Sequence, residues 1–156
     1  MEKLNIDLDI KRCDIGELND TDRMLVETAK QATDNSYSPY SHFSVGAAVL
    51  LADGTVVKGA NQENAAFSVT ICAERSAIFA AQAQYPQQPI KAIAIAARNA
   101  EGFTSAPVSP CGSCRQAMVE IEMKYAQPLH ILLYGEKEIY VAESIRSLMP
   151  LCFTDF

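Results

Sequence analysis

Two nearly continuous apolar runs constrain the fold of this chain more than any other feature. KAIAIAA covers residues 91–97 and LHILLY covers residues 129–134. Runs this short and this apolar, with polar residues on either side, predict β-strands that other elements cover on both faces. A sheet with two covered faces needs helices on each side, which is the arrangement of an α/β protein.

Four helices are predicted around these strands, from residues that favour helix starts and from prolines that limit helix ends. The first is predicted with Asp20 or Thr21 as its N-cap, and ICAERSAIFAAQAQ predicts a second with Thr70 as its N-cap. A third has Ser109 as its N-cap and Pro110 at its first position, a favoured pairing. ESIRSLM predicts a short last helix.

The remaining strands complete the predicted fold. Residues 4–10 alternate between apolar and polar side chains, and residues 43–60 predict a hairpin around an Asp53-Gly54 turn. The order of elements predicts a three-layer α/β/α sandwich with a mixed five-stranded sheet. Because no linker or repeat divides the chain, residues 1–156 are expected to form a single domain, with residues 1–18 as an N-terminal extension that adds a strand.

Composition narrows the range of partners. The net charge is −6 and no basic cluster is present, which argues against a nucleic acid polymer and favours a neutral small molecule. No run is long and apolar enough to span a bilayer, and the N-terminal residues lack the apolar core of a signal peptide, so we expect no membrane association and a cytoplasmic location. Five cysteines, an odd count, fit a disulfide framework poorly.

Cys111 and Cys114 lie three residues apart at a predicted helix start, where the helix dipole favours thiolates. This motif alone leaves a thioredoxin-like redox pair and a metal site equally open. Cys72 favours the metal, because it also lies in the first turn of a predicted helix. Two helix starts can offer three thiolates to one ion and leave one position open, which is typical of a catalytic zinc rather than a structural one.

Glu74 follows Cys72 by two residues. A carboxylate beside a metal, but not bound to it, can take a proton from metal-bound water and pass it on. Taken alone, Glu74 would be interpreted as a solvated charge in a first helical turn. A non-catalytic zinc-stabilised module stays an alternative, and it requires a fourth protein ligand such as Cys152 or a histidine.

Together, CAE at residues 72–74 and PCGSC at residues 110–114 resemble the signature of the zinc nucleobase deaminases. The chain is most similar to the cytidine deaminases, in their small homotetrameric form with three cysteine ligands. The resemblance runs from about residue 38 to residue 153 and includes SPYSHFSVGAA, GANQENAA, CAERSA, SPCGSCRQ and LMPLCF.

This resemblance implies a cytidine deaminase-like fold, one Zn²⁺ per subunit on Cys72, Cys111 and Cys114, and Glu74 as the catalytic acid and base. The implied reaction is hydrolytic deamination of cytidine and deoxycytidine to uridine and deoxyuridine with release of ammonia, in pyrimidine salvage. Arg75 is implied to hydrogen-bond to thiolate sulfur and withdraw charge from the metal, with a surface salt bridge as its alternative role.

The implied substrate-binding residues are Phe43, Asn61, Glu63, Ala73 and Phe153. Phe43 lines the pyrimidine site, whereas Asn61 and Glu63 hold the ribose hydroxyls. Phe153 would come from a neighbouring subunit and stack on the base, so the resemblance implies a homotetramer with shared active sites.

Some positions depart from the family pattern. Ser44 stands where the family usually has proline, and Phe67 where many members have tyrosine. His42 and His130 are not expected to bind zinc. A deaminase of a modified cytosine nucleoside or a blasticidin-type antibiotic is the nearest rival, but such relatives need not keep the Asn61 and Glu63 pattern.

Overall fold

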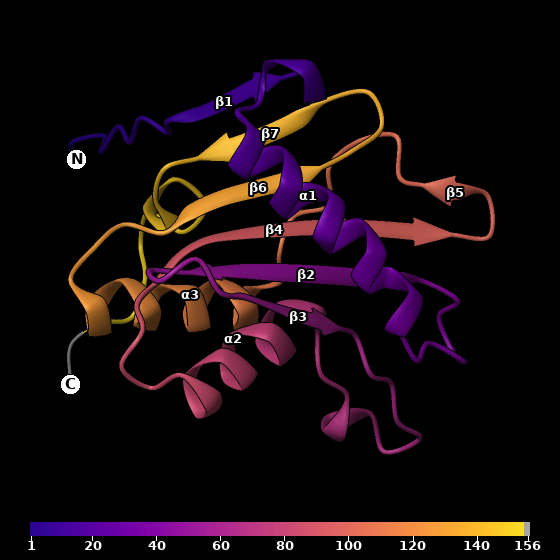
Figure 1. The fold of residues 1–156 in the computed structure, drawn as a ribbon. Coiled ribbons are helices and arrows are strands. Elements are labelled where there is room, and N and C mark those ends of the chain that lie inside the picture. The colour runs from indigo at the N-terminus through magenta and orange to yellow at the C-terminus, as the bar shows by residue number, and fades with distance from the viewer. Residues whose placement is uncertain (155–156) are drawn as a thin grey trace.

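The computed structural model describes residues 1–154 and contains one mixed β-sheet with helices on both faces (Figure 1). The strand order is β1-β7-β6-β4-β2-β3, with β5 paired to β4, and β4 and β6 form the parallel pair. The strands are β1 (Ile10–Cys13), β2 (Ser44–Leu51), β3 (Val56–Ala60), β4 (Ile90–Asn99), β5 (Gly102–Phe103), β6 (His130–Tyr134) and β7 (Ile139–Ala142).

The predicted three-layer sandwich is confirmed, but the predicted number of strands is wrong, because the sheet has seven strands instead of five. The additional strands are β5 and β7, which have two and four residues and are too short to leave a clear periodic pattern. Each is the return arm of a tight connection from a longer strand. Strand formation there is decided by the partner strand and not by local sequence.

The N-terminal strand is also displaced from its predicted position. Residues 10–13 form β1 and pair with β7, so that Ile10 lies opposite Ala142 at the end of its partner strand. Residues before Ile10 run beyond that end, and the apolar Leu4 and Leu8 are exposed. The alternation from residue 4 therefore does not mark a strand of this sheet.

Three α-helices cover the sheet: α1 (Asp20–Ala32), α2 (Ala73–Gln84) and α3 (Gly112–Tyr125). All three N-caps differ from the predicted residues, which are Asp20 or Thr21, Thr70 and Ser109. The observed N-caps are Asn19, Cys72 and Cys111. ESIRSLM forms only the 3₁₀ turn η4 (Ile145–Ser147); the other 3₁₀ turns are η1 (Ile15–Glu17), η2 (Thr33–Asn35) and η3 (Phe67–Val69). Among the described residues, no helix combines the length and apolar character needed to cross a bilayer.

The late start of α2 has a tertiary cause. The Thr70 hydroxyl accepts a hydrogen bond from the backbone N–H of Asn64 at 3.2 Å instead of capping the helix. Ile71 remains extended because it exchanges two backbone hydrogen bonds with Gln62. The helix can begin only after this pairing ends, which places Cys72 at the N-cap.

The two faces of the sheet carry side chains of different size. Ile93 and Ile95 of β4 pack with residues of α2 and α3, whereas Ala92, Ala94 and Ala96 pack with residues of α1. Figure 1 shows α1 crossing one face and α2 and α3 on the other. Because isoleucine and alanine alternate in KAIAIAA, the large side chains fill the space towards α2 and α3. The small side chains on the opposite face let α1 pack close to the sheet.

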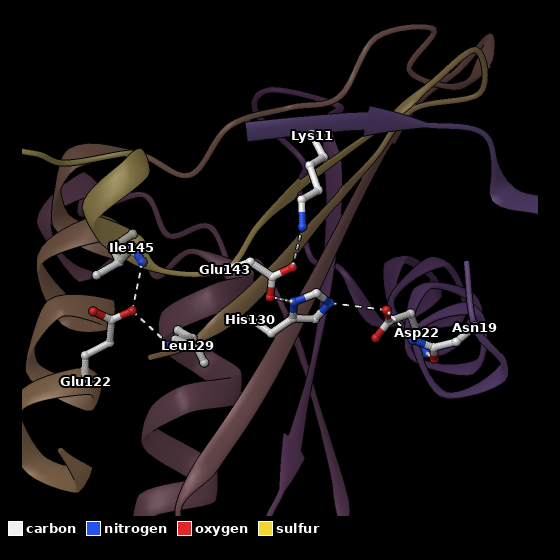
Figure 2. A network of polar contacts seen from close by, with 8 residues as sticks. All are labelled: Lys11, Asn19, Asp22, Glu122, Leu129, His130, Glu143 and Ile145. Atoms are coloured by element: carbon white, nitrogen blue, oxygen red, sulfur yellow. Dashed lines mark hydrogen bonds and ion pairs between the residues drawn. The ribbon is translucent and has the colours of Figure 1, made fainter. Parts of the chain in front are cut away.

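A chain of polar contacts joins the N-terminal extension to α1 (Figure 2). Lys11 of β1 donates to Glu143 at 3.3 Å, and the second carboxylate oxygen of Glu143 lies 2.9 Å from Nδ1 of His130. Nε2 of His130 lies 3.2 Å from Asp22 in the first turn of α1. His130 thus has carboxylate neighbours on two sides in this network.

Gly59 of β3 sets how closely α2 approaches the sheet. A Cβ atom at this position would collide with the backbone nitrogen of Ala77 and would lie 2.5 Å from the carbonyl oxygen of Ala73. Backbone atoms at that distance cannot yield as a flexible side chain does. The absence of a side chain at Gly59 therefore lets the first turn of α2, which follows Cys72, pack directly on β3.

We predict that Gly59→Ala lowers the free energy of unfolding by about 1–3 kcal/mol through overpacking of α2 on β3. Urea denaturation followed by circular dichroism measures this change. The matched control is Gly16→Ala, where an added Cβ meets no atom within 4 Å, and its effect is expected to stay within about 0.5 kcal/mol. Equal urea midpoints for Gly59→Ala and wild type would contradict the packing argument.

Candidate active site

The three cysteines singled out by the sequence meet where α2 and α3 begin. Cys72 is the N-cap of α2, Cys111 is the N-cap of α3, and Cys114 lies in the first turn of α3. The sulfur of Cys111 lies 3.8 Å from that of Cys72 and 3.4 Å from that of Cys114. All three sulfur atoms lie within 4.8 Å of one another. Two helix starts from distant parts of the chain therefore converge on one point.

The size and chemistry of this cluster fit a zinc ion. Three sulfur ligands bound at about 2.3 Å to one tetrahedral zinc lie about 3.8 Å apart, close to the separations measured from Cys111. The hydrogen bond from Cys114 and the nearby guanidinium of Arg75 lower the pKa of Cys72 to about 5. The bond to Cys72 and burial raise the pKa of Cys114. Binding of a cation to these sulfur atoms would release the protons that the thiols carry.

A fourth protein ligand, which the structural-zinc alternative requires, is not part of this cluster in the described chain. Cys152 instead accepts a hydrogen bond from Nη1 of Arg146 at 2.7 Å. His130 is engaged by Asp22 and Glu143. The ligand set among residues 1–154 is thus the three-sulfur set that is typical of a catalytic zinc.

Glu74 is the buried acid of the site. Its side chain is in the first turn of α2 and only 5% of the residue is exposed, which excludes the interpretation as a solvated surface charge. Burial, reinforced by the neighbouring Cys72, raises the pKa of this carboxyl group. A carboxyl group whose pKa is raised towards neutrality is suited both to accept and to donate a proton.

Arg75 contacts the sulfur cluster. Its Nη2 atom donates to the sulfur of Cys72 at 3.8 Å, and this contact raises the pKa of the arginine. The alternative role of Arg75 was a surface salt bridge. Among the described residues, its guanidinium forms no salt bridge with a carboxylate. A guanidinium placed on a thiolate sulfur withdraws negative charge from the ligand set.

A cavity of about 270 Å³ opens beside the cysteines. The predicted site residues that line it are Phe43, Asn61, Glu63, Cys72, Ala73, Glu74 and Cys111. Val45, Ile95 and Val108 add apolar wall, while Ser41, Thr70, Ile71 and Ser109 complete the lining. One cavity therefore brings together the acid, two of the sulfur ligands and most of the predicted substrate-binding residues.

Asn61 organises the cavity wall as well as lining it. Its side-chain oxygen accepts from the backbone N–H of Val45 at 2.8 Å and from the hydroxyl of Ser36 at 2.7 Å. Its amide nitrogen donates to the carbonyl of Phe43 at 2.9 Å. Asn61 thus fixes the start of β2 and the position of Phe43, and one amide N–H stays outside these bonds.

Glu63 is held by the turn that precedes Phe43. One carboxylate oxygen accepts from the backbone N–H groups of Tyr40 and Ser41, at 2.9 and 3.2 Å. The hydrogen bond from the Ser41 side chain, together with these backbone bonds, lowers the pKa of Glu63. Sequence reasoning did not assign a role to Ser41, although the quoted SPYSHF segment contains it.

Phe153 lies outside the lining of this cavity. Its backbone carbonyl accepts a hydrogen bond from Nε2 of Gln116 at 2.8 Å, and 64% of the residue is exposed. The sequence assigns Phe153 to the site of a neighbouring subunit, and a single chain leaves that assignment a prediction.

The sequence and the fold of this chain are similar to those of known proteins. A family model described as the cytidine and deoxycytidylate deaminase zinc-binding region matches residues 19–127. A cytidine deaminase from Halalkalibacterium halodurans is 48% identical over 85% of this chain and 93% of that protein, and one from Sporosarcina psychrophila is 46% identical over 86% and 92%. A crystal structure of cytidine deaminase from Burkholderia pseudomallei, 38% identical, aligns with a TM-score of 0.73 over 83% of this chain and 97% of that chain. With its three-layer fold and buried Glu74 beside three cysteines, this chain belongs to the cytidine and deoxycytidylate deaminase family of hydrolytic enzymes.

Proposed function

We propose that this protein hydrolyses cytidine and deoxycytidine to uridine and deoxyuridine and releases ammonia, with one Zn²⁺ per subunit held by Cys72, Cys111 and Cys114. The observation that carries the proposal is the meeting of these sulfur atoms with the buried Glu74 at one cavity. The proposed role of this reaction is pyrimidine salvage, in the cytoplasm.

The cavity lining favours a nucleoside over a nucleotide. Glu63 and Glu74 are the charged side chains among the lining residues, and no lysine or arginine of the described chain lines the cavity. A phosphate group would meet carboxylates there instead of the lysine or arginine side chains that pair with phosphates. Phe43 and the apolar wall suit the pyrimidine ring, and Glu63 with Asn61 suits the sugar hydroxyls.

The chemistry assigned to Glu74 follows from its burial. Zinc, when bound, lowers the pKa of a coordinated water towards about 7 and so supplies the nucleophile. Glu74 accepts one proton and delivers it to N3 of the cytosine ring, which makes C4 electrophilic. After the water oxygen has bonded to C4, Glu74 takes the remaining proton of that oxygen and passes it to the amine, whose bond to C4 breaks as ammonia leaves. The overall balance is one water consumed for each ammonia released.

Arg75 and Phe153 have supporting roles in this proposal. The Arg75 contact with Cys72 offsets the net negative charge that three thiolates place on zinc. Phe153 would stack on the cytosine ring in the site of a neighbouring subunit, so that a homotetramer shares its active sites. The exposed position of this side chain in one chain supports such a role.

Ammonia release from a panel of substrates tests the function directly. We expect turnover of cytidine and deoxycytidine, and at least about 100-fold lower kcat/KM for cytidine monophosphate, because like charges placed together cost several kcal/mol and the carboxylates of the cavity repel its phosphate. Adenosine serves as the control for ring specificity. Activity on a blasticidin-type antibiotic without activity on either nucleoside would establish the rival function instead.

Glu74→Gln should lower kcat by at least about 10²–10⁴-fold, because the amide cannot relay a proton, while bound zinc stays unchanged. Cys72→Ser should lower both zinc content and activity, whereas Cys13→Ser, a cysteine of β1 distant from the cluster in sequence, should leave both unchanged. Elemental analysis and ammonia release provide the measurements. Appreciable activity in Glu74→Gln would remove Glu74 from its catalytic role.

Mixed oligomers test the shared site. Phe153→Ala should weaken substrate stacking by about 1–3 kcal/mol, and Glu74→Gln should inactivate its own site. When the two variants are unfolded together and refolded, some sites pair an intact Glu74 with an intact Phe153 from a neighbour. The activity of the mixture should then exceed the sum of the activities of the two variants measured separately. An activity equal to that sum would place Phe153 outside the neighbouring site.

A further inference from the structure

We propose that Arg115 is a positioning residue that holds the metal-binding loop in place by joining it to the C-terminal segment. Nε of Arg115 donates to the carbonyl of Pro110 at 2.8 Å, and Nη1 donates to the carbonyl of Leu148 at 2.7 Å. The inference rests on the proposed zinc site, because Pro110 directly precedes Cys111.

The bond to Pro110 acts on the peptide that leads into Cys111. Pro110 is buried and its ring fixes φ, so the orientation of its carbonyl determines where the Cys111 backbone begins. Cys111 is the most exposed of the three cysteines, whereas Cys114 is buried. Burial holds Cys114 in place. The exposed Cys111 instead depends on the hydrogen bond from Arg115 to the carbonyl that precedes it.

The other arm of Arg115 is anchored on a rigid element. Leu148 follows η4, and the start of η4 is bound to Glu122 of α3 (Figure 2). One Glu122 oxygen accepts from the backbone N–H groups of Ile145 and Leu129, at 2.8 and 2.9 Å, and the other accepts from the Ser144 hydroxyl at 3.0 Å. Helix α3 thus holds η4 at both ends, by a carboxylate at its start and by a guanidinium at its end.

Only arginine can make both bonds of this contact. The planar guanidinium presents several N–H groups in fixed directions, whereas a lysine ammonium is one point on a flexible stem. Arg115 is half-buried, so its geometry is restricted by its surroundings. The next residue, Gln116, donates to the carbonyl of Phe153. Consecutive α3 residues therefore attach the C-terminal segment beside the metal loop.

The test is the rate at which the zinc-loaded protein releases zinc to excess chelator, followed with a chromogenic zinc indicator. Arg115→Lys keeps the charge but not the paired geometry, and it should release zinc at least about 10-fold faster, as is usual when a group that orients a metal ligand is lost. Arg115→Gln, measured alongside, should release zinc at least as fast. Arg12→Lys, on an exposed strand residue, should match wild type.

Glu122→Gln separates positioning from general loosening. This variant weakens the opposite end of η4 without touching Pro110, so its thermal midpoint should fall while zinc release stays within about twofold of wild type. Wild-type release rates in both Arg115 variants, or equal acceleration in Arg115→Lys and Glu122→Gln, would overturn the inference. Ammonia release from cytidine by the same wild-type preparation is scored separately, so that a zinc-loaded but inactive protein would overturn the proposed function alone.

Discussion

The meeting of two helix starts at one point is the constraint on which the remaining features of this protein depend. Cys72 caps α2 and Cys111 caps α3, and their sulfur atoms lie 3.8 Å apart although 39 positions separate them in sequence. Thiolates this close repel one another. A divalent cation bound between them offsets that repulsion.

The sheet makes this convergence possible. Large side chains of β4 face α2 and α3, so both helices rest on one apolar layer, and Gly59 lets α2 approach β3 backbone to backbone. Glu74 lies in the same first turn of α2 and is buried. The raised pKa of the carboxyl group is therefore a consequence of the packing of the whole layer.

Sequence reasoning selected residues that the fold brings together, but it placed the boundaries of the elements less well. Cysteine spacing and Glu74 are local signals that keep their meaning in any fold, and the alternating strand at residues 91–97 is long enough to be read directly. The sequence predicts Thr70 as the N-cap of α2, but pairing with Gln62 keeps Ile71 extended, and the helix begins later. The short β7 and the two roles of Asn61 likewise depend on contacts with distant segments.

Helix α3 connects these observations. It provides Cys111 and Cys114, and in the next turns it binds η4 through Arg115 and Glu122 and the tail through Gln116. Because of these bonds, the start of α3, with its candidate metal ligands, cannot shift without moving the segment that contains Phe153. If Phe153 serves a neighbouring subunit, as we propose, the position of the metal loop in one subunit and the aromatic wall of the next are set by the same rigid element.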